Sequence, residues 1–181
     1  MTLSPPTLPS SPRDREVLRR RAVRLAGVAD PARAAPVGEL FLIVRLGAAE
    51  LYGIPYAHMD EIVRPRGLTP VPCTPDFVAG VLSRRGHLIT VLSLCRLLPM
   101  EGREEAGDDA RIAIIRTEGM TVGLLVDAVE GNDRWTPGAL SPALPSPGVR
   151  DPSWIAGIHD GRVAMLDIES LLAVISKEEM R

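Results

Sequence analysis

Aromatic side chains are scarce in this sequence, since two Trp, two Tyr and two Phe make up only 3% of its 181 residues. Proteins that bind single-stranded nucleic acid stack its bases on aromatic side chains over a positively charged surface. The formal net charge of −2 offers no general attraction to nucleic acid or to an anionic membrane. We therefore expect no nucleic-acid partner and a core built from aliphatic side chains.

Cysteine is also rare, and the two that occur, Cys73 and Cys95, form no C-x-x-C pair and have no histidine at ligand spacing. We expect both to be reduced thiols, buried or half-buried. No run of about 18 apolar residues occurs anywhere in the chain. These features predict a cytoplasmic protein without direct membrane insertion, bound metal or other cofactor.

Catalytic motifs are missing as well. The sequence holds no G-x-S-x-G nucleophile turn, no H-E-x-x-H pair and no glycine-rich phosphate loop. His87 and His159 are expected in solvated hairpin turns, and Asp127 and Asp167 are expected to cap elements or form salt bridges. The pattern favours a binding module over an enzyme, although a small-barrel enzyme whose site assembles in space stays open as an alternative.

Lysine is represented by Lys177 alone, so arginine supplies 20 of the 21 basic residues. Seven of these arginines lie in residues 1–38 against three acids, which makes a basic leader of +4 before an acidic body of −6. We expect residues 1–11 to be disordered, 12–26 to form an amphipathic helix with Leu18 and Leu25 on its apolar face, and 29–38 to be a linker. The helix could pack on its own domain or fray, or it could dock on a partner or an anionic surface.

Beyond the leader, the alternation of apolar and polar residues predicts short strands joined by turns. The expected strands are 40–46, 50–54, the hairpin around 80–94, 111–117, 121–126, 154–158 and 162–166. Short helical segments are expected after Pro55, at 76–79, at 95–98 and at 168–175, and a Pro/Gly/Ser-rich loop is expected over 131–151.

The two halves of this region resemble each other. Gly53-Ile54 matches Gly123-Leu124, and Gly86 followed by a strand and an L-x-x-L-L pattern matches Gly161 with its own strand and pattern. Such self-similarity indicates a duplicated unit. We expect an all-β fold of two small antiparallel β-barrels with short helices, the first mainly 39–100 and the second mainly 110–166, because closed barrels remove exposed strand edges.

The ordered motifs of residues 39–176 resemble the chemotaxis coupling protein family, the CheW-like adaptors. The likeness lies in Gly53-Ile54-Pro55, Glu61-Ile62, Thr74-Pro75-x-Phe77-Val78-x-Gly80-Val81, Arg85-Gly86, Val122-Gly123-Leu124-Leu125-Val126-Asp127 and Ile155-x-Gly157-Ile158. The resemblance implies that the fold consists of two SH3-like five-stranded β-barrels. It also implies a non-catalytic scaffold that couples the cytoplasmic tip of a chemoreceptor to the regulatory domain of a CheA-type histidine kinase. An alternative is a CheW-like regulator that binds a kinase or a response regulator without receptor coupling.

Five candidate interface residues follow from that resemblance. Arg85 matches the family's hairpin arginine and Glu61 the acid of its E-I motif, so the two are expected to pair, which would satisfy a charge on an otherwise apolar hairpin. Met59 and Gly80 match positions near receptor contacts. Arg84 departs from the family pattern, and we expect it to be the residue that alters partner choice.

Overall fold

The computed structural model describes residues 38–98, 107–117, 119–136, 138–143 and 151–178. The predicted N-terminal helix at 12–26 and its linker lie outside these residues. The described chain belongs to a compact unit that begins at Gly38. Among the described residues, no helix is both long enough and apolar enough to cross a membrane.

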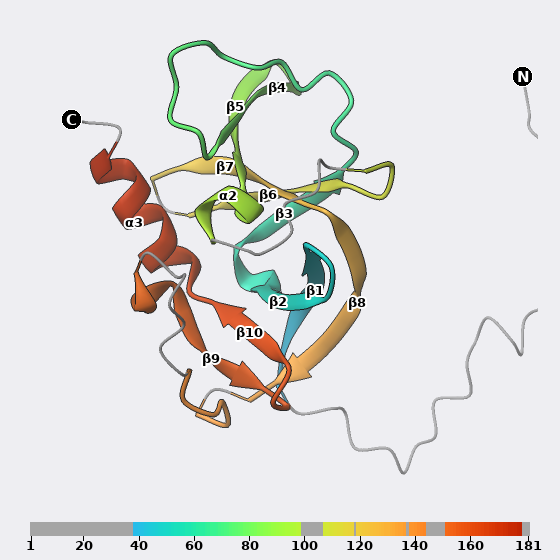
Figure 1. Cartoon of the computed structure of the whole chain (residues 1–181), viewed down its shortest axis with the longest axis vertical. Coiled ribbons are helices and arrows are strands. Elements are labelled where there is room, and N and C mark those ends of the chain that lie inside the picture. Colours follow the sequence, from blue (N-terminus) through green and yellow to red (C-terminus); the bar gives the residue numbers. More distant parts are fainter. Residues whose placement is uncertain (1–37, 99–106, 118, 137, 144–150, 179–181) are drawn as a thin grey trace, which may run out of the picture. The chain divides into compact units, whose positions relative to one another are not determined.

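Ten strands are present in the described chain, in groups of two or three that are each followed by a helical segment (Figure 1). The first five strands are β1 (Glu39–Leu46), β2 (Glu50–Pro55), β3 (Met59–Val63), β4 (Val78–Arg84) and β5 (His87–Ser93), with η1 (Tyr56–His58) before β3 and α2 (Leu94–Leu97) after β5. The next five are β6 (Arg111–Arg116), β7 (Thr121–Val126), β8 (Ala128–Trp135), β9 (Ile155–His159) and β10 (Val163–Leu166), with η2 (Pro152–Trp154) before β9 and α3 (Ile168–Glu178) after β10.

These strands form two five-stranded sheets, as expected. The first sheet has the order β8-β1-β2-β10-β9 and the second has the order β3-β6-β7-β5-β4. Each sheet therefore combines strands from both halves of the chain. The predicted division into barrels of 39–100 and 110–166 is wrong in this respect, because that prediction assumed that strands neighbouring in sequence stay in one sheet.

One pair of strands in each sheet is parallel, where antiparallel pairing was predicted throughout. β10 runs parallel to β2, and β5 runs parallel to β7. The members of each pair come from different halves of the chain. No tight turn joins them, so none requires them to run in opposite directions.

The two sheets repeat the same local details, which supports the predicted duplication. Gly53 of β2 faces Met165 of β10, and Gly123 of β7 faces Val91 of β5, at equivalent places in the two parallel pairs. A Cβ atom on Gly53 would overlap the Met165 sulfur, and one on Gly123 would lie 2.6 Å from Ile112 Cγ2. Both positions require glycine because neighbouring side chains occupy the space.

The edge strands β4 and β9 are matched in the same way. Each is bridged by a residue of a preceding loop, Thr69 to Val81 and Ser141 to Ile158, through two backbone hydrogen bonds of 2.8–3.0 Å. Such bridges cover part of a strand edge that would otherwise offer its backbone groups to another chain.

A hydrophobic core is shared by both sheets and the helices. It includes buried side chains from β1, β2, β5, β7, α2 and α3, among them Val44, Leu92, Leu124, Leu97 and Leu171. Most of its members are aliphatic, as the low aromatic content predicts. Burying a leucine or valine stabilises the fold by about 1.5–3 kcal/mol relative to exposure.

The helical turn predicted after Pro55 is present as η1, but it ends at His58, and residues 59–63 form strand β3. Two other element predictions are wrong. Residues 76–79 form a turn that leads into β4, closed by the Val78 N–H donating to the Pro75 carbonyl at 3.0 Å. Strand β8 occupies 128–135, the beginning of the predicted loop. Its polar side chains concealed it, because an edge strand pairs with one neighbour and exposes much of its length.

The two cysteines differ in environment. Cys95 is half-buried, with its sulfur 3.1 Å from a carboxylate oxygen of Asp127, whereas Cys73 is exposed. The prediction that Cys73 is buried is wrong, since the proline-rich loop that holds it lies at the surface, where Cys73 has a left-handed conformation with φ 60°. Asp127 also accepts a hydrogen bond from the Gly47 N–H at 2.7 Å, and Asp167 caps α3 at Ser170, as expected for carboxylates at strand ends.

Candidate interaction surface

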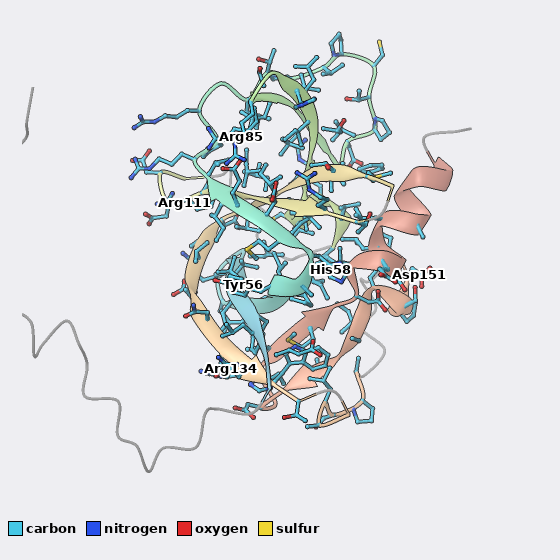
Figure 2. All side chains as sticks on the ribbon, turned by 180° about the vertical axis from the view of Figure 1, so that it is seen from behind. Tyr56, His58, Arg85, Arg111, Arg134 and Asp151 are labelled. Atoms are coloured by element: carbon cyan, nitrogen blue, oxygen red, sulfur yellow. The ribbon has the colours of Figure 1, made fainter. Side chains whose placement is uncertain are left out.

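The β4–β5 hairpin ends in a tight turn formed by Arg85 and Gly86. Both residues have positive φ, 49° and 82°, as a two-residue type I′ turn requires. Arginine rarely adopts this conformation, so the turn is held by the strands that it joins. Figure 2 shows Arg85 toward the end of the molecule opposite Arg134 of β8.

Glu61 of β3 meets both hairpin arginines, although unequally. Arg84 donates two hydrogen bonds to the Glu61 carboxylate, from Nε to Oε1 at 2.9 Å and from Nη2 to Oε2 at 2.7 Å. Arg85 approaches the same carboxylate at only 3.5 Å, and its side chain is 72% exposed against 43% for Arg84. The predicted contact between Arg85 and Glu61 is therefore present but loose, whereas Arg84 forms the tight pair and Arg85 is the more exposed arginine.

The charges of the tight pair support each other. The hydrogen bond from Arg84, together with the charges of Arg84 and Arg85, lowers the pKa of the Glu61 carboxyl below its usual value, and the same hydrogen bond raises the pKa of Arg84. An exposed pair of this kind contributes little to stability. Its bidentate geometry, however, fixes the direction of the β4–β5 hairpin and joins β3 to β4, the two edge strands of the second sheet. We call this contact the β3–β4 junction.

A cleft of about 460 Å³ lies beside the junction. Its charged and apolar lining is formed by Asp60, Glu61, Arg84, Arg85, His87, Leu88, Ile89, Ile114, Arg116 and Thr121. Asp60 and Arg116 form a further ion pair of 2.8 Å in this lining. Leu88 is 76% exposed and presents apolar surface among these charged residues.

Met59 and Gly80 do not line this cleft. Met59 is half-buried and packs against the core, and Gly80 is buried with φ 145° beside the loop at Thr69. Their contact with a partner stays a prediction. The sequence reasoning missed Asp60, Leu88 and Arg116. Leu88 could have been found from strand alternation, since Ile89 and Val91 are buried and Leu88 must point the other way.

A second hollow of about 550 Å³ lies on the first sheet. Its lining includes Leu51, Tyr52, Ile158 and Ala164. Tyr52 donates a hydrogen bond to Glu50 Oε2 at 2.9 Å, and burial together with this hydrogen bond raises the pKa of its hydroxyl. The two hollows belong to different sheets, so the molecule offers two separate surfaces.

Comparison with known proteins identifies the class of this fold. The structure is similar to that of the scaffolding protein TtCheW from Thermoanaerobacter tengcongensis, with a TM-score of 0.66 and 26% identity over 77% of this chain and 90% of that one. The family model of the CheW-like domain matches residues 40–176. The chain therefore belongs to the CheW-like domain family.

Curated relatives agree with this assignment. Chemotaxis protein CheW of Klebsiella aerogenes is 30% identical over 162 residues, which cover 86% of this chain and 94% of the relative. Protein FrzA of Myxococcus xanthus is 36% identical over 100 residues, 55% of this chain and 61% of the relative. The match to chemotaxis protein CheW of Treponema pallidum covers 49% of that protein.

Proposed function

We propose that this protein is a non-catalytic scaffold of chemotaxis-like signalling, which couples the cytoplasmic tip of a chemoreceptor to the regulatory domain of a CheA-type histidine kinase. The observation that carries the proposal is the match to the CheW-like domain over 40–176, together with the likeness to a scaffolding protein. With these partners the protein would act in the cytoplasm, beside receptor arrays.

A coupling protein needs two surfaces that different partners can occupy at once. The cleft at the β3–β4 junction and the hollow on the first sheet meet this need, because they lie on different sheets that share one core. A packed core transmits geometry from one surface to the other. Control of the kinase then follows from holding both partners in a fixed arrangement.

At the cleft, apolar and charged groups have separate roles. Leu88 supplies exposed apolar area that a partner can bury, and Arg85 supplies a charge that is only loosely held by Glu61. The Arg84–Glu61 pair fixes the direction of the hairpin that carries both. Complementary charges at such a rim act mainly on specificity and association rate.

The experiment is receptor-dependent kinase activation reconstituted with purified variants. We expect Leu88→Asp and Arg85→Ala to weaken activation by loss of partner contact, and Arg84→Ala and Glu61→Gln to weaken it by loss of hairpin direction. Arg45→Ala is the matched control, because Arg45 forms an exposed ion pair of similar length, 2.8 Å to Glu130, on the first sheet.

Activation that survives all four cleft substitutions would contradict the role of this surface. Pull-down with separate kinase and receptor fragments tests the coupling itself. Binding of the kinase without binding of the receptor would instead support the regulator without receptor coupling.

A further inference from the structure

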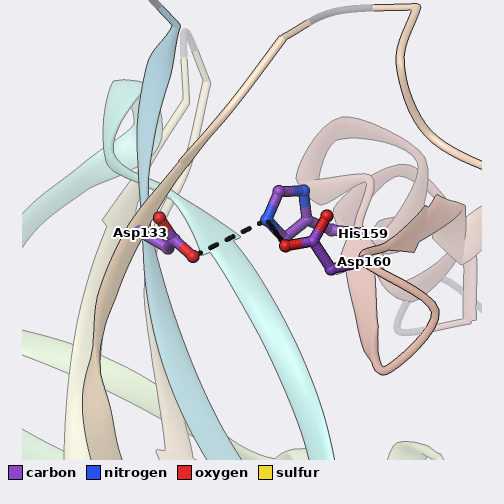
Figure 3. A group of neighbouring side chains, drawn as sticks. All are labelled: Asp133, His159 and Asp160. Atoms are coloured by element: carbon purple, nitrogen blue, oxygen red, sulfur yellow. Dashed lines mark ion pairs between the residues drawn. The ribbon is translucent and has the colours of Figure 1, made fainter. Parts of the chain in front are cut away.

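The first sheet has its own contact between edge strands, at the place equivalent to the β3–β4 junction. Asp133 lies on β8, His159 is the last residue of β9, and Asp160 begins the turn toward β10 (Figure 3). The His159 Nε2 atom lies 3.7 Å from Asp133 Oδ2 and 3.5 Å from Asp160 Oδ2. We call this group the β8–β9 junction.

The imidazole of His159 is largely buried, with 15% of the side chain exposed, so the prediction of a solvated histidine is wrong. Its ring packs edge-on against Phe41, with centroids 5.0 Å apart. Its Nε2 atom is buried and has no hydrogen-bond partner among the described residues. A buried polar atom without a partner is costly, and an ion or a water bound at this nitrogen would remove the cost.

The charges at the two junctions differ. At the β3–β4 junction one acid meets two arginines, whereas at the β8–β9 junction two acids face one imidazole. With a neutral ring this group carries two negative charges close together. Such an arrangement is stabilised by a cation placed between the three side chains.

The distances favour a metal ion over direct hydrogen bonds. Separations of 3.5 and 3.7 Å are longer than those of good N–H···O hydrogen bonds, about 2.7–3.2 Å. Tetrahedral zinc with bonds of about 2.0–2.2 Å separates its ligand atoms by roughly 3.3–3.6 Å. All three ligand atoms already lie within 4.8 Å of one another.

We propose that Asp133, His159 and Asp160 bind a divalent transition-metal ion of the zinc class, which closes the first sheet by linking β8 to β9. The imidazole nitrogen favours zinc over magnesium or calcium, which prefer oxygen ligands. Both carboxylates are exposed, so the remaining coordination position is open to water. The ion would do at this junction what the Arg84–Glu61 pair does at the other.

Zinc titration by calorimetry tests this proposal, with the Cys73→Ser chain as the starting protein because an exposed thiol binds zinc by itself. We expect one zinc ion per chain, a rise in melting temperature with zinc, and tetrahedral absorption bands when cobalt replaces zinc. Asp160→Asn should weaken binding by about tenfold or more. Asparagine tolerates the positive φ of this position, 49°, so this variant should fold.

His159→Gln should abolish the cobalt bands. His87→Gln is the matched control, because His87 is an exposed histidine at the end of the other hairpin, and it should leave zinc binding unchanged. Zinc affinity that is equal in the starting protein, Asp160→Asn and His159→Gln would overturn the proposal. So would a starting protein that binds no zinc.

Discussion

At the β3–β4 junction an acid of one edge strand meets two arginines of the other strand and its turn, whereas at the β8–β9 junction an acid meets a histidine and a second acid. Both junctions join the outer strands of a five-stranded sheet, which have no shared backbone ladder. The strand order around them is equivalent, so the repeated unit specifies where the sheets close. The side chains then determine whether the closure is direct or requires a ligand.

Substitutions of the glycines next to the loop bridges of β4 and β9 should destabilise the protein most. Gly80→Ala should destabilise the protein by about 3 kcal/mol, because its Cβ would overlap the Thr69 carbonyl oxygen at a φ of 145°. Gly157→Ala should cost less, because its nearest contacts, the Leu140 Cβ at 2.7 Å and the Ser141 carbonyl oxygen at 2.9 Å, would overlap the new Cβ less closely. Urea unfolding measures both.

Gly67→Ala is the control for these two variants, because Gly67 has φ 81° and a Cβ atom added there would meet nothing within 4 Å. It should cost only about 1 kcal/mol for the left-handed backbone. If Gly80→Ala loses no more stability than Gly67→Ala, the loop at Thr69 does not sterically exclude a side chain at position 80 of β4.

Substitutions of the glycines in the parallel strand pairs should give the next largest loss of stability. Gly123→Ala should cost about 2 kcal/mol, because Ile112 and Val91 are branched and have little rotamer freedom to move aside. Gly53→Ala should cost less, since the nearest atom is the sulfur of unbranched Met165. Thermal unfolding of both variants gives the order, and the reverse order would show that Phe41, 2.9 Å away, is the stricter neighbour.

The two hairpin arginines should differ by a smaller amount, in the energy of their coupling to Glu61. A double-mutant cycle between Glu61→Gln and Arg84→Ala should show a measurable coupling, whereas the cycle with Arg85→Ala should show less, because only Arg84 donates two short hydrogen bonds. Urea midpoints at low and high salt provide the measurement. Both changes in urea midpoint should be smaller than those of the glycine variants, and equal couplings would contradict the conclusion that Arg84 is the main partner of Glu61.

The smallest effect is a pH dependence. Because the pKa of Glu61 is lower in the folded protein than in the unfolded chain, its contribution to stability is present above the ordinary glutamate range and is lost as the pH falls through the lowered pKa. Carboxyl NMR titration should show this pKa rising toward its usual value in Arg84→Ala. An unchanged pKa in that variant would assign the shift to another group.

Much of the fold follows from local patterns. The alternation of apolar and polar residues predicted β1, β2 and the β4–β5 and β6–β7 hairpins, and the matched glycines predicted a duplicated unit. Strand β8 was missed because exposed polar side chains conceal an edge strand. The mixing of strands from the two halves was missed because pairing partners such as β1 and β8 are distant in sequence.

The candidate site was predicted in part. The sequence placed Glu61 opposite an arginine of the hairpin tip, and the structure shows this contact with Arg84 as the main partner. The choice between two adjacent arginines depends on which side chain leaves the turn toward β3. Arg84 is the last residue of β4, whereas Arg85 lies in the turn with positive φ, and a resemblance to other sequences does not reveal this difference.

What the sequence by itself determined is therefore local: an aliphatic core, short strands, and tight turns at glycines such as Gly86 and Gly161, which adopt positive φ without strain. The tertiary structure decided which strands share a sheet, which arginine holds Glu61, and that His159 is buried between two acids. The physical reason is the distance along the sequence over which each interaction acts. Backbone preferences act over a few residues, whereas pairing and burial depend on segments that meet only when the two halves pack together.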